Sequence, residues 1–124
     1  MAWEDKYLNM MNQWLILKQE GKGIDTYLLK QGYKVVAVYG MAIYGRHVIR
    51  ELHGSDVKIL YAIDQKKLSP YKNIEVRQPM EGLPHVDAII NTVLSDDVNI
   101  KSHLTTIINS PVVSLEDIIF ESYG

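Results

Sequence analysis

The chain has 124 residues, a formal net charge of −2, 47% hydrophobic and 23% charged residues, and no cysteine. This length and composition predict one globular domain and exclude an intrinsically disordered chain. The absence of cysteine excludes disulfides, thiolate metal sites and thiol catalysis. The sequence has no basic stripe, so no nucleic-acid partner is expected, and no apolar run is long enough to span a membrane. The first residues lack the basic and apolar regions of a signal peptide, which predicts a cytoplasmic protein.

Residues 1–33 are predicted to form a helical extension. Apolar residues recur at helical spacing from residue 3 to about 20, and Gly21-Lys22-Gly23 ends this helix. A short second helix follows, with Asp25 as its N-cap and Gly32 just past its end. The aromatic and apolar side chains of the first helix either pack on the sheet or contact a second copy or a partner protein. The candidates for that contact are Trp3, Tyr7, Met11 and Trp14.

Residues 34–124 alternate between strand and helix patterns. The predicted strands are residues 34–39, 57–63, 74–76, 86–92 and 111–113, and helices are expected at 43–53, after Ser95 or Asp96, and at 115–120. Residues 65–85 hold three of the four prolines and are expected to contain no regular helix. The alternation predicts a parallel sheet with right-handed crossovers, in the order 3-2-1-4-5. The expected fold is a single three-layer, Rossmann-like α/β domain with the helical extension added.

The turn Gly40-Met41-Ala42-Ile43-Tyr44-Gly45 follows a buried strand and opens a helix. Gly40 allows a sharp turn, and Gly45 allows the helix to lie close to the first strand. Backbone N–H groups in the first turn of that helix are suited to a phosphate group. Asp64 ends the next strand, at nearly the spacing expected of a carboxylate that binds ribose hydroxyls. Ala42 stands where the dinucleotide fingerprint has its middle glycine, so its methyl group narrows the space for a pyrophosphate.

Four further side chains are candidates for ligand contact. Asn91 and Thr92 end the fourth strand, beside the first strand in the expected sheet, and either bind a ribose, a nicotinamide or a sugar or only begin a loop. Met41 and Ile43 pack either against an adenine or sugar face or in the core. The predicted cofactor-binding set is Gly40, Met41, Ala42, Ile43, Gly45, Asp64, Asn91 and Thr92.

Familiar catalytic motifs are absent from the sequence. It contains no Tyr-x-x-x-Lys, no Gly-x-Ser-x-Gly elbow and no Gly-Lys-Ser/Thr phosphate loop, so no catalytic residue is assigned. The four histidines, at 47, 53, 85 and 103, form no ligand-spaced pair, so no metal site is expected. His85 is either a general base or a surface residue.

Three segments together resemble the small NAD(P)-binding-like Rossmann domains of bacterial surface-polysaccharide proteins, which occur beside glycosyltransferases or sugar acyltransferases. These segments are residues 35–46, 61–64 and 86–90, and the similarity extends over roughly residues 34–120. The resemblance implies an accessory module for a nucleotide or a nucleotide sugar, with NAD(P) as a candidate ligand, in polysaccharide or sugar metabolism.

Three functions are therefore distinguished. The first is this nucleotide-binding module without catalytic machinery of its own. The second is a ligand-free interaction scaffold, as a homodimer or as the partner of a glycosyltransferase. The third is a minimal oxidoreductase or methyltransferase that borrows catalytic groups from a partner.

Overall fold

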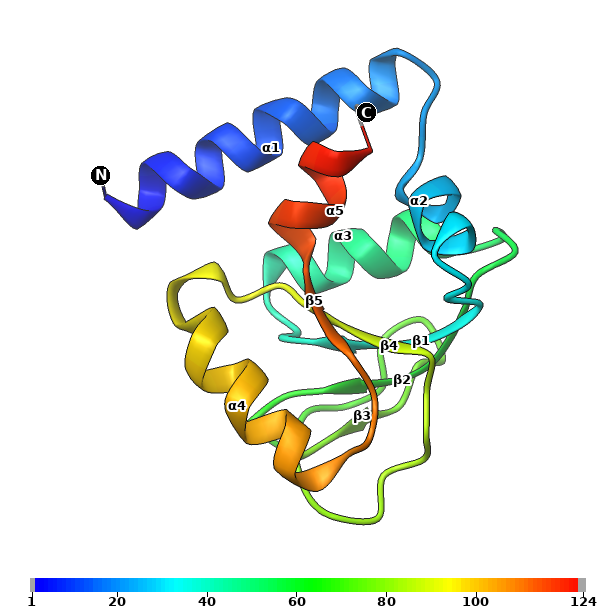
Figure 1. Cartoon of the computed structure of the whole chain (residues 1–124), viewed down its shortest axis with the longest axis vertical. Helices are drawn as coiled ribbons and strands as arrows, with labels where there is room; N and C mark the ends of the chain where they lie inside the picture. Colours follow the sequence, from blue (N-terminus) through cyan, green and yellow to red (C-terminus); the bar gives the residue numbers. More distant parts are fainter. Residues whose placement is uncertain (1, 123–124) are drawn as a thin grey trace.

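Five parallel strands form one sheet in the order β3-β2-β1-β4-β5, as predicted. The computed structural model describes residues 2–122 (Figure 1). The strands are β1 (Val35–Tyr39), β2 (Lys58–Ile63), β3 (Val76–Arg77), β4 (Ala88–Asn91) and β5 (Val112–Ser114). The central strands are nearly continuous apolar runs because both of their faces are covered. The Rossmann-like α/β prediction is confirmed.

Helices cover both faces of the sheet, which gives three layers. They are α1 (Trp3–Gln19), α2 (Ile24–Lys30), α3 (Ile43–Leu52), η1 (Leu94–Asp96), α4 (Asp97–Ile107) and α5 (Leu115–Glu121). Buried side chains of α1, α2, α3 and α5 form one core with the sheet. The other core lies between the sheet and α4, the helix that Figure 1 shows on the other face of the sheet from α3. The segment between β2 and β4 contains no helix, as its prolines predict.

Two local predictions differ from the structure, and a third, that Ser95 or Asp96 caps α4, is confirmed. Asp25 is not the N-cap of α2, because Gly23 holds that position in extended conformation and Asp25 lies in the first turn. The third strand begins at Val76 rather than Ile74, because Ile74 pairs with Tyr71 across a tight turn. Asp96 is the N-cap of α4, although its side chain makes no capping hydrogen bond.

The N-terminal helix is fastened to the domain by one carboxylate. Glu51 at the end of α3 accepts a hydrogen bond from Trp14 Nε1 and another from the backbone N–H of Ile24, each at 2.6 Å. Trp14 is only 4% exposed, so the core-packing alternative is confirmed for it. Tyr7 also makes internal contacts, because its ring stacks on Tyr44 at 4.5 Å.

A second carboxylate lies at the amino ends of the central strands. Asp87 Oδ2 accepts hydrogen bonds from the backbone N–H groups of Lys34 and Val35, both at 2.9 Å. These two bonds, first that of Val35, lower the pKa of Asp87 from its ordinary value. Asp87 therefore ties the start of β4 to the start of β1.

Candidate functional site

The glycine turn between β1 and α3 requires glycine at two positions. Gly40 has a φ of +94°, and a Cβ there would lie 2.6 Å from Thr92 Oγ1. A Cβ on Gly45 would lie 1.8 Å from the carbonyl oxygen of Gly40. The predicted roles of both residues in a tight turn and close packing are therefore confirmed. Ala42 is the exposed N-cap of α3, so its methyl group is on the outer side of the turn.

Asp64 holds this turn in place. Its Oδ2 accepts a hydrogen bond from the backbone N–H of Met41 at 2.8 Å, and its Oδ1 accepts one from the N–H of Lys66 at 2.9 Å. One N–H group of the turn thus already binds a carboxylate. A phosphate group at this N–H would meet a negative charge, which disfavours a pyrophosphate directly on the turn.

Asn91 and Thr92 do not face a ligand. Both are buried, and the Asn91 side chain hydrogen-bonds Val93 and Asp97. The Thr92 hydroxyl lies within hydrogen-bond distance of the carbonyl oxygens of Tyr39 and Gly40, at 2.8 and 3.1 Å. These side chains satisfy buried polar groups where β4 lies beside β1. This arrangement fits the alternative in which Asn91 and Thr92 only begin the loop after β4.

The two apolar candidates, Met41 and Ile43, differ in burial. Met41 is buried and belongs to the core, so the core alternative is confirmed for it. Ile43 is 65% exposed on the first turn of α3, so its alternative of core packing is excluded.

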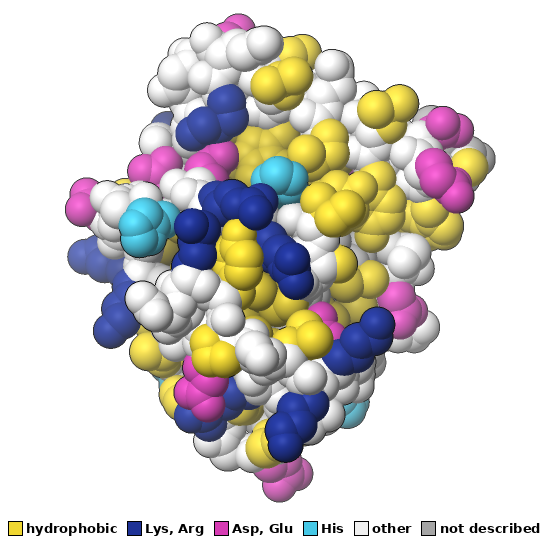
Figure 2. Space-filling view, turned by 180° about the vertical axis from the view of Figure 1, so that it is seen from behind, with side chains coloured by type: hydrophobic (Ala, Val, Ile, Leu, Met, Phe, Trp, Pro, Cys, Tyr) yellow, Lys and Arg dark blue, Asp and Glu magenta, His cyan; other side chains and the backbone are white. Residues whose placement is uncertain are grey.

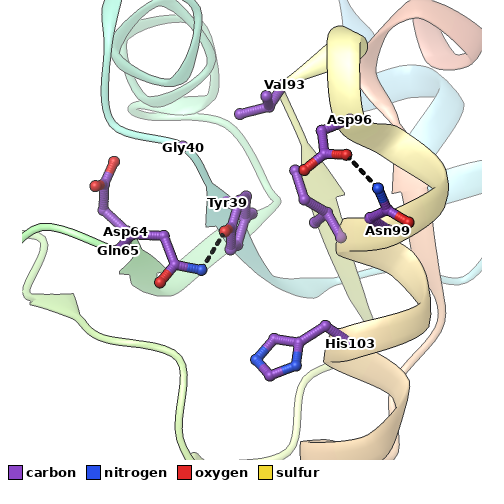
Figure 3. A pocket seen from close by; sticks show the side chains of 9 residues that line it. Tyr39, Gly40, Asp64, Gln65, Val93, Asp96, Asn99 and His103 are labelled. Atoms are coloured by element: carbon purple, nitrogen blue, oxygen red, sulfur yellow. Dashed lines mark hydrogen bonds between the residues drawn. The ribbon is translucent and has the colours of Figure 1, made fainter.

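A cleft of about 420 Å³ lies at the carboxyl ends of β1, β2 and β4, the place where open α/β sheets bind ligands. Two walls face one another in Figure 3. One wall comes from the ends of β1 and β2, and the other comes from the β4–α4 segment. The lining residues are Tyr39, Gly40, Asp64, Gln65, Val93, Asp96, Asn99, Ile100 and His103.

The cleft is rich in hydrogen-bonding side chains. Gln65 Nε2 donates to the hydroxyl of Tyr39 at 3.0 Å on one wall. Asn99 Nδ2 donates to Asp96 Oδ1 at 2.7 Å on the other wall. These pairs orient the side chains that line the cleft (Figure 3).

Negative charge predominates in the cleft. Asp64 and Asp96 stand on opposite walls, and the lining contains no lysine or arginine. His103 lines the wall that α4 supplies. Such a site favours ligands that donate hydrogen bonds from hydroxyl, amine or amide groups over ligands that place phosphate inside it.

Sequence reasoning identified Gly40 and Asp64 in this cleft and missed most of the other lining residues. Asp96 was considered only as a helix cap. Asp96, Asn99 and His103 are spaced three and four residues apart, and this helical spacing after β4 was a usable signal for one polar face.

The geometry around His85 gives no second candidate site. His85 Nδ1 lies 3.3 Å from the Ser110 hydroxyl, but that hydroxyl donates to the carbonyl oxygen of Val86 at 2.7 Å. His85 precedes β4 and therefore lies at the opposite edge of the sheet from the cleft. For His85 the general-base alternative has no support from this geometry. Within residues 2–122, no group of three or more His, Asp or Glu side chains could hold a metal ion.

No protein-family model matches the chain, and no curated protein or solved structure matches it. No helix within the described residues is both long enough and apolar enough to cross a bilayer.

Proposed function

We propose that this protein is a binding module for a nucleoside-containing small molecule, held in the cleft between Asp64 and Asp96. The proposal rests on the position of that cleft in the sheet and on the side chains that line it. It lies at the carboxyl ends of the strands where the strand order reverses, and carboxylates stand on both of its walls. Its volume of about 420 Å³ falls within the range of ligand pockets.

The ligand's hydroxyl groups are the part that this cleft suits. A carboxylate accepts two hydrogen bonds from a vicinal diol such as that of ribose, and Asp64 stands where nucleotide-binding sheets carry such a carboxylate. Asp96 and Asn99 offer an acceptor and a donor on the opposite wall. A ribose or a hexose could therefore contact both walls.

Phosphate groups of the ligand would lie outside the cleft. The backbone N–H of Met41 already donates to Asp64, and the residues that line the cleft include no lysine or arginine. The exposed start of α3, with Arg46 in its first turns, is a favourable surface for them. This arrangement favours a nucleoside or a nucleotide sugar over a dinucleotide held by its pyrophosphate.

No group in the cleft is paired as a nucleophile and base, so the proposal includes no reaction. The resemblance to polysaccharide-associated domains adds nucleotide sugars to the ligands worth testing. NAD remains among them because the fold suits it.

Thermal unfolding with adenosine, uridine, UDP, UDP-glucose, NAD and inorganic pyrophosphate, each at millimolar concentration, tests this proposal. At least one nucleoside or nucleotide sugar should raise the melting temperature, because a ligand well above its dissociation constant stabilises the folded state. Pyrophosphate alone should not. Isothermal titration then gives the affinity.

The variant Asp96→Ala should weaken that binding roughly 10-fold or more, since a hydrogen bond to a charged group is removed. Its folding should change little because the side chain makes no capping bond. Asp56→Ala, in the exposed loop before β2, is the matched control and should bind as the unaltered protein does. Absence of any ligand effect, or equal affinity in Asp96→Ala, would contradict the proposal.

A further inference from the structure

One face of α1 carries apolar side chains that the described residues cover only in part. The buried face of the helix carries Met10, Trp14 and Leu17. A second row, Leu8, Met11 and Leu15, follows the spacing of three and four residues that places side chains in one stripe. Leu8 is 70% exposed and Leu15 is 57% exposed. We call these three residues the α1 stripe.

The stripe borders a groove between α1 and α3. The two helices run in the same direction, since Tyr7 stacks on Tyr44 near their starts and Lys18 Nζ lies 3.7 Å from Glu51 Oε1 near their ends. The groove has a volume of about 460 Å³, and Met11, Trp14 and Leu15 supply its apolar part. Figure 2 shows apolar side chains in a hollow on this face, beside a histidine and bordered by Lys and Arg.

Exposed apolar side chains are frequent on the two helices that border the groove, and Leu8 and Leu15 share the α1 stripe. Among the described residues, four of the eight large hydrophobic side chains that are exposed lie on α1 or on the first turn of α3. These are Trp3, Leu8, Leu15 and Ile43. Apolar side chains gathered on one face mark an interaction surface, whereas scattered ones do not.

Charge is distributed unequally along the groove. Its end near the C-terminus of α1 is lined by Lys18, Arg50 and the inward carboxylate of Glu51, which is engaged by Trp14 and Ile24. The start of α1 carries Glu4 and Asp5, both exposed. The helix is therefore acidic at the start of its exposed face and basic at the end.

This pattern is complementary to itself in only one orientation. Glu4 and Lys18 flank the stripe at the same helical spacing, so the row reads Glu4, Leu8, Met11, Leu15, Lys18. When two copies of α1 lie antiparallel about a two-fold axis near Met11, each Glu4 meets the other copy's Lys18 and each Leu8 meets its Leu15. A parallel pair would place like charges together.

We infer that this face binds a second copy of this chain, with the two α1 helices antiparallel across a two-fold axis at Met11. The interface is isologous, because the same stripe lies on both subunits. The spacing of three and four residues matches the seam of two packed helices. The two clefts at the strand ends take no part, so this inference does not rest on the proposed function.

Sedimentation velocity between about 1 µM and 1 mM tests this, a range that covers weak and moderate dimers. The expected result is a species of twice 14.2 kDa that increases with concentration. Leu15→Asp should raise the dissociation constant roughly 100-fold or more, because the change occurs twice in a two-fold interface. Val98→Asp is the matched control, since Val98 is 80% exposed on α4 over the other face of the sheet.

A charge-reversal pair tests the orientation. Glu4→Lys alone and Lys18→Glu alone should each weaken the dimer, because each places like charges together twice. Lys18→Glu also replaces the 3.7 Å contact with Glu51 of the same chain by a pair of carboxylates, so recovery in the mixture is the decisive readout. An equimolar mixture of the two variants should restore it, since both contacts then join opposite charges. Circular dichroism establishes that each variant is folded.

The alternatives have distinct results. A monomer throughout the concentration range overturns the inference and leaves the groove to a different protein. A dimer that persists in Leu15→Asp, or that is lost equally in Val98→Asp, overturns the assignment to α1. Failure of the mixture to associate overturns the antiparallel arrangement.

Discussion

At the scale of single residues, the glycine turn depends on contacts between backbone atoms. The carbonyl oxygen of Gly40 approaches Gly45 so closely that a Cβ at Gly45 would lie 1.8 Å from it. The Thr92 hydroxyl lies 3.1 Å from the same carbonyl oxygen. A flexible neighbour could move away, but a backbone carbonyl held by β1 and β4 cannot.

Gly45→Ala should therefore destabilise the protein by about 3 kcal/mol, since overpacking against rigid atoms outweighs the better helix propensity of alanine. Urea unfolding followed by circular dichroism measures this. Gly54→Ala is the control, because its Cβ meets nothing within 4 Å and only its φ of +79° opposes it. That variant should lose about 1 kcal/mol. Equal losses in both variants would show that steric contact at the turn is unimportant.

At the scale of elements, Glu51 joins three helices. It projects from α3, accepts hydrogen bonds from Trp14 of α1 and Ile24 of α2, and has only 8% of its side chain exposed. Two donors converge on its two oxygens. A glutamine has one oxygen acceptor, so its amide nitrogen would face a donor.

Glu51→Gln should lower the free energy of unfolding by about 2 kcal/mol, because a buried donor loses its partner. The emission maximum of tryptophan should also shift to longer wavelength as the end of α1 loosens around Trp14. Glu20→Gln, exposed just beyond α1, is the control and should change neither quantity. Unchanged stability in Glu51→Gln would contradict the fastening role of this carboxylate.

At the scale of the whole molecule, the two cores share one sheet. Val36 and Val38 of β1 face the core under α1, α2, α3 and α5, while Ala37 and Tyr39 face the core under α4. The helical extension contributes Met10, Trp14 and Leu17 to the first of these cores. Its loss would expose part of the sheet's own core, so α1 is a structural part of the domain.

The domain should therefore unfold in one cooperative transition. Tryptophan fluorescence reports mainly on α1, and circular dichroism at 222 nm reports on all helices. In urea the two midpoints should coincide, as expected of a two-state domain of this size. An earlier fluorescence transition would show instead that α1 detaches on its own.

The sequence by itself determined the α/β class, the strand order and the need for glycine at residues 40 and 45. The class and the glycine positions follow from local periodicity and backbone conformation, and the strand order follows from the general rules for connecting parallel strands. It also placed Asp64 at the carboxyl end of β2. Short edge strands were less predictable: β3 has two residues, and its start depends on the turn between Tyr71 and Ile74.

Only the tertiary structure determined which polar side chains are buried in internal hydrogen bonds and which line the cleft. Asn91 and Thr92 are buried because β4 lies directly beside β1, and Asp64 binds Met41 because β2 ends next to the turn. The wall containing Asp96 and His103 exists because α4 packs across the sheet from residues far away in the chain. In the sequence, Trp14 could either pack in the core or contact a partner. In the structure it is buried, and its indole N–H donates to Glu51, 37 positions away in the chain. Each of these outcomes depends on contacts between distant segments, which local patterns do not encode.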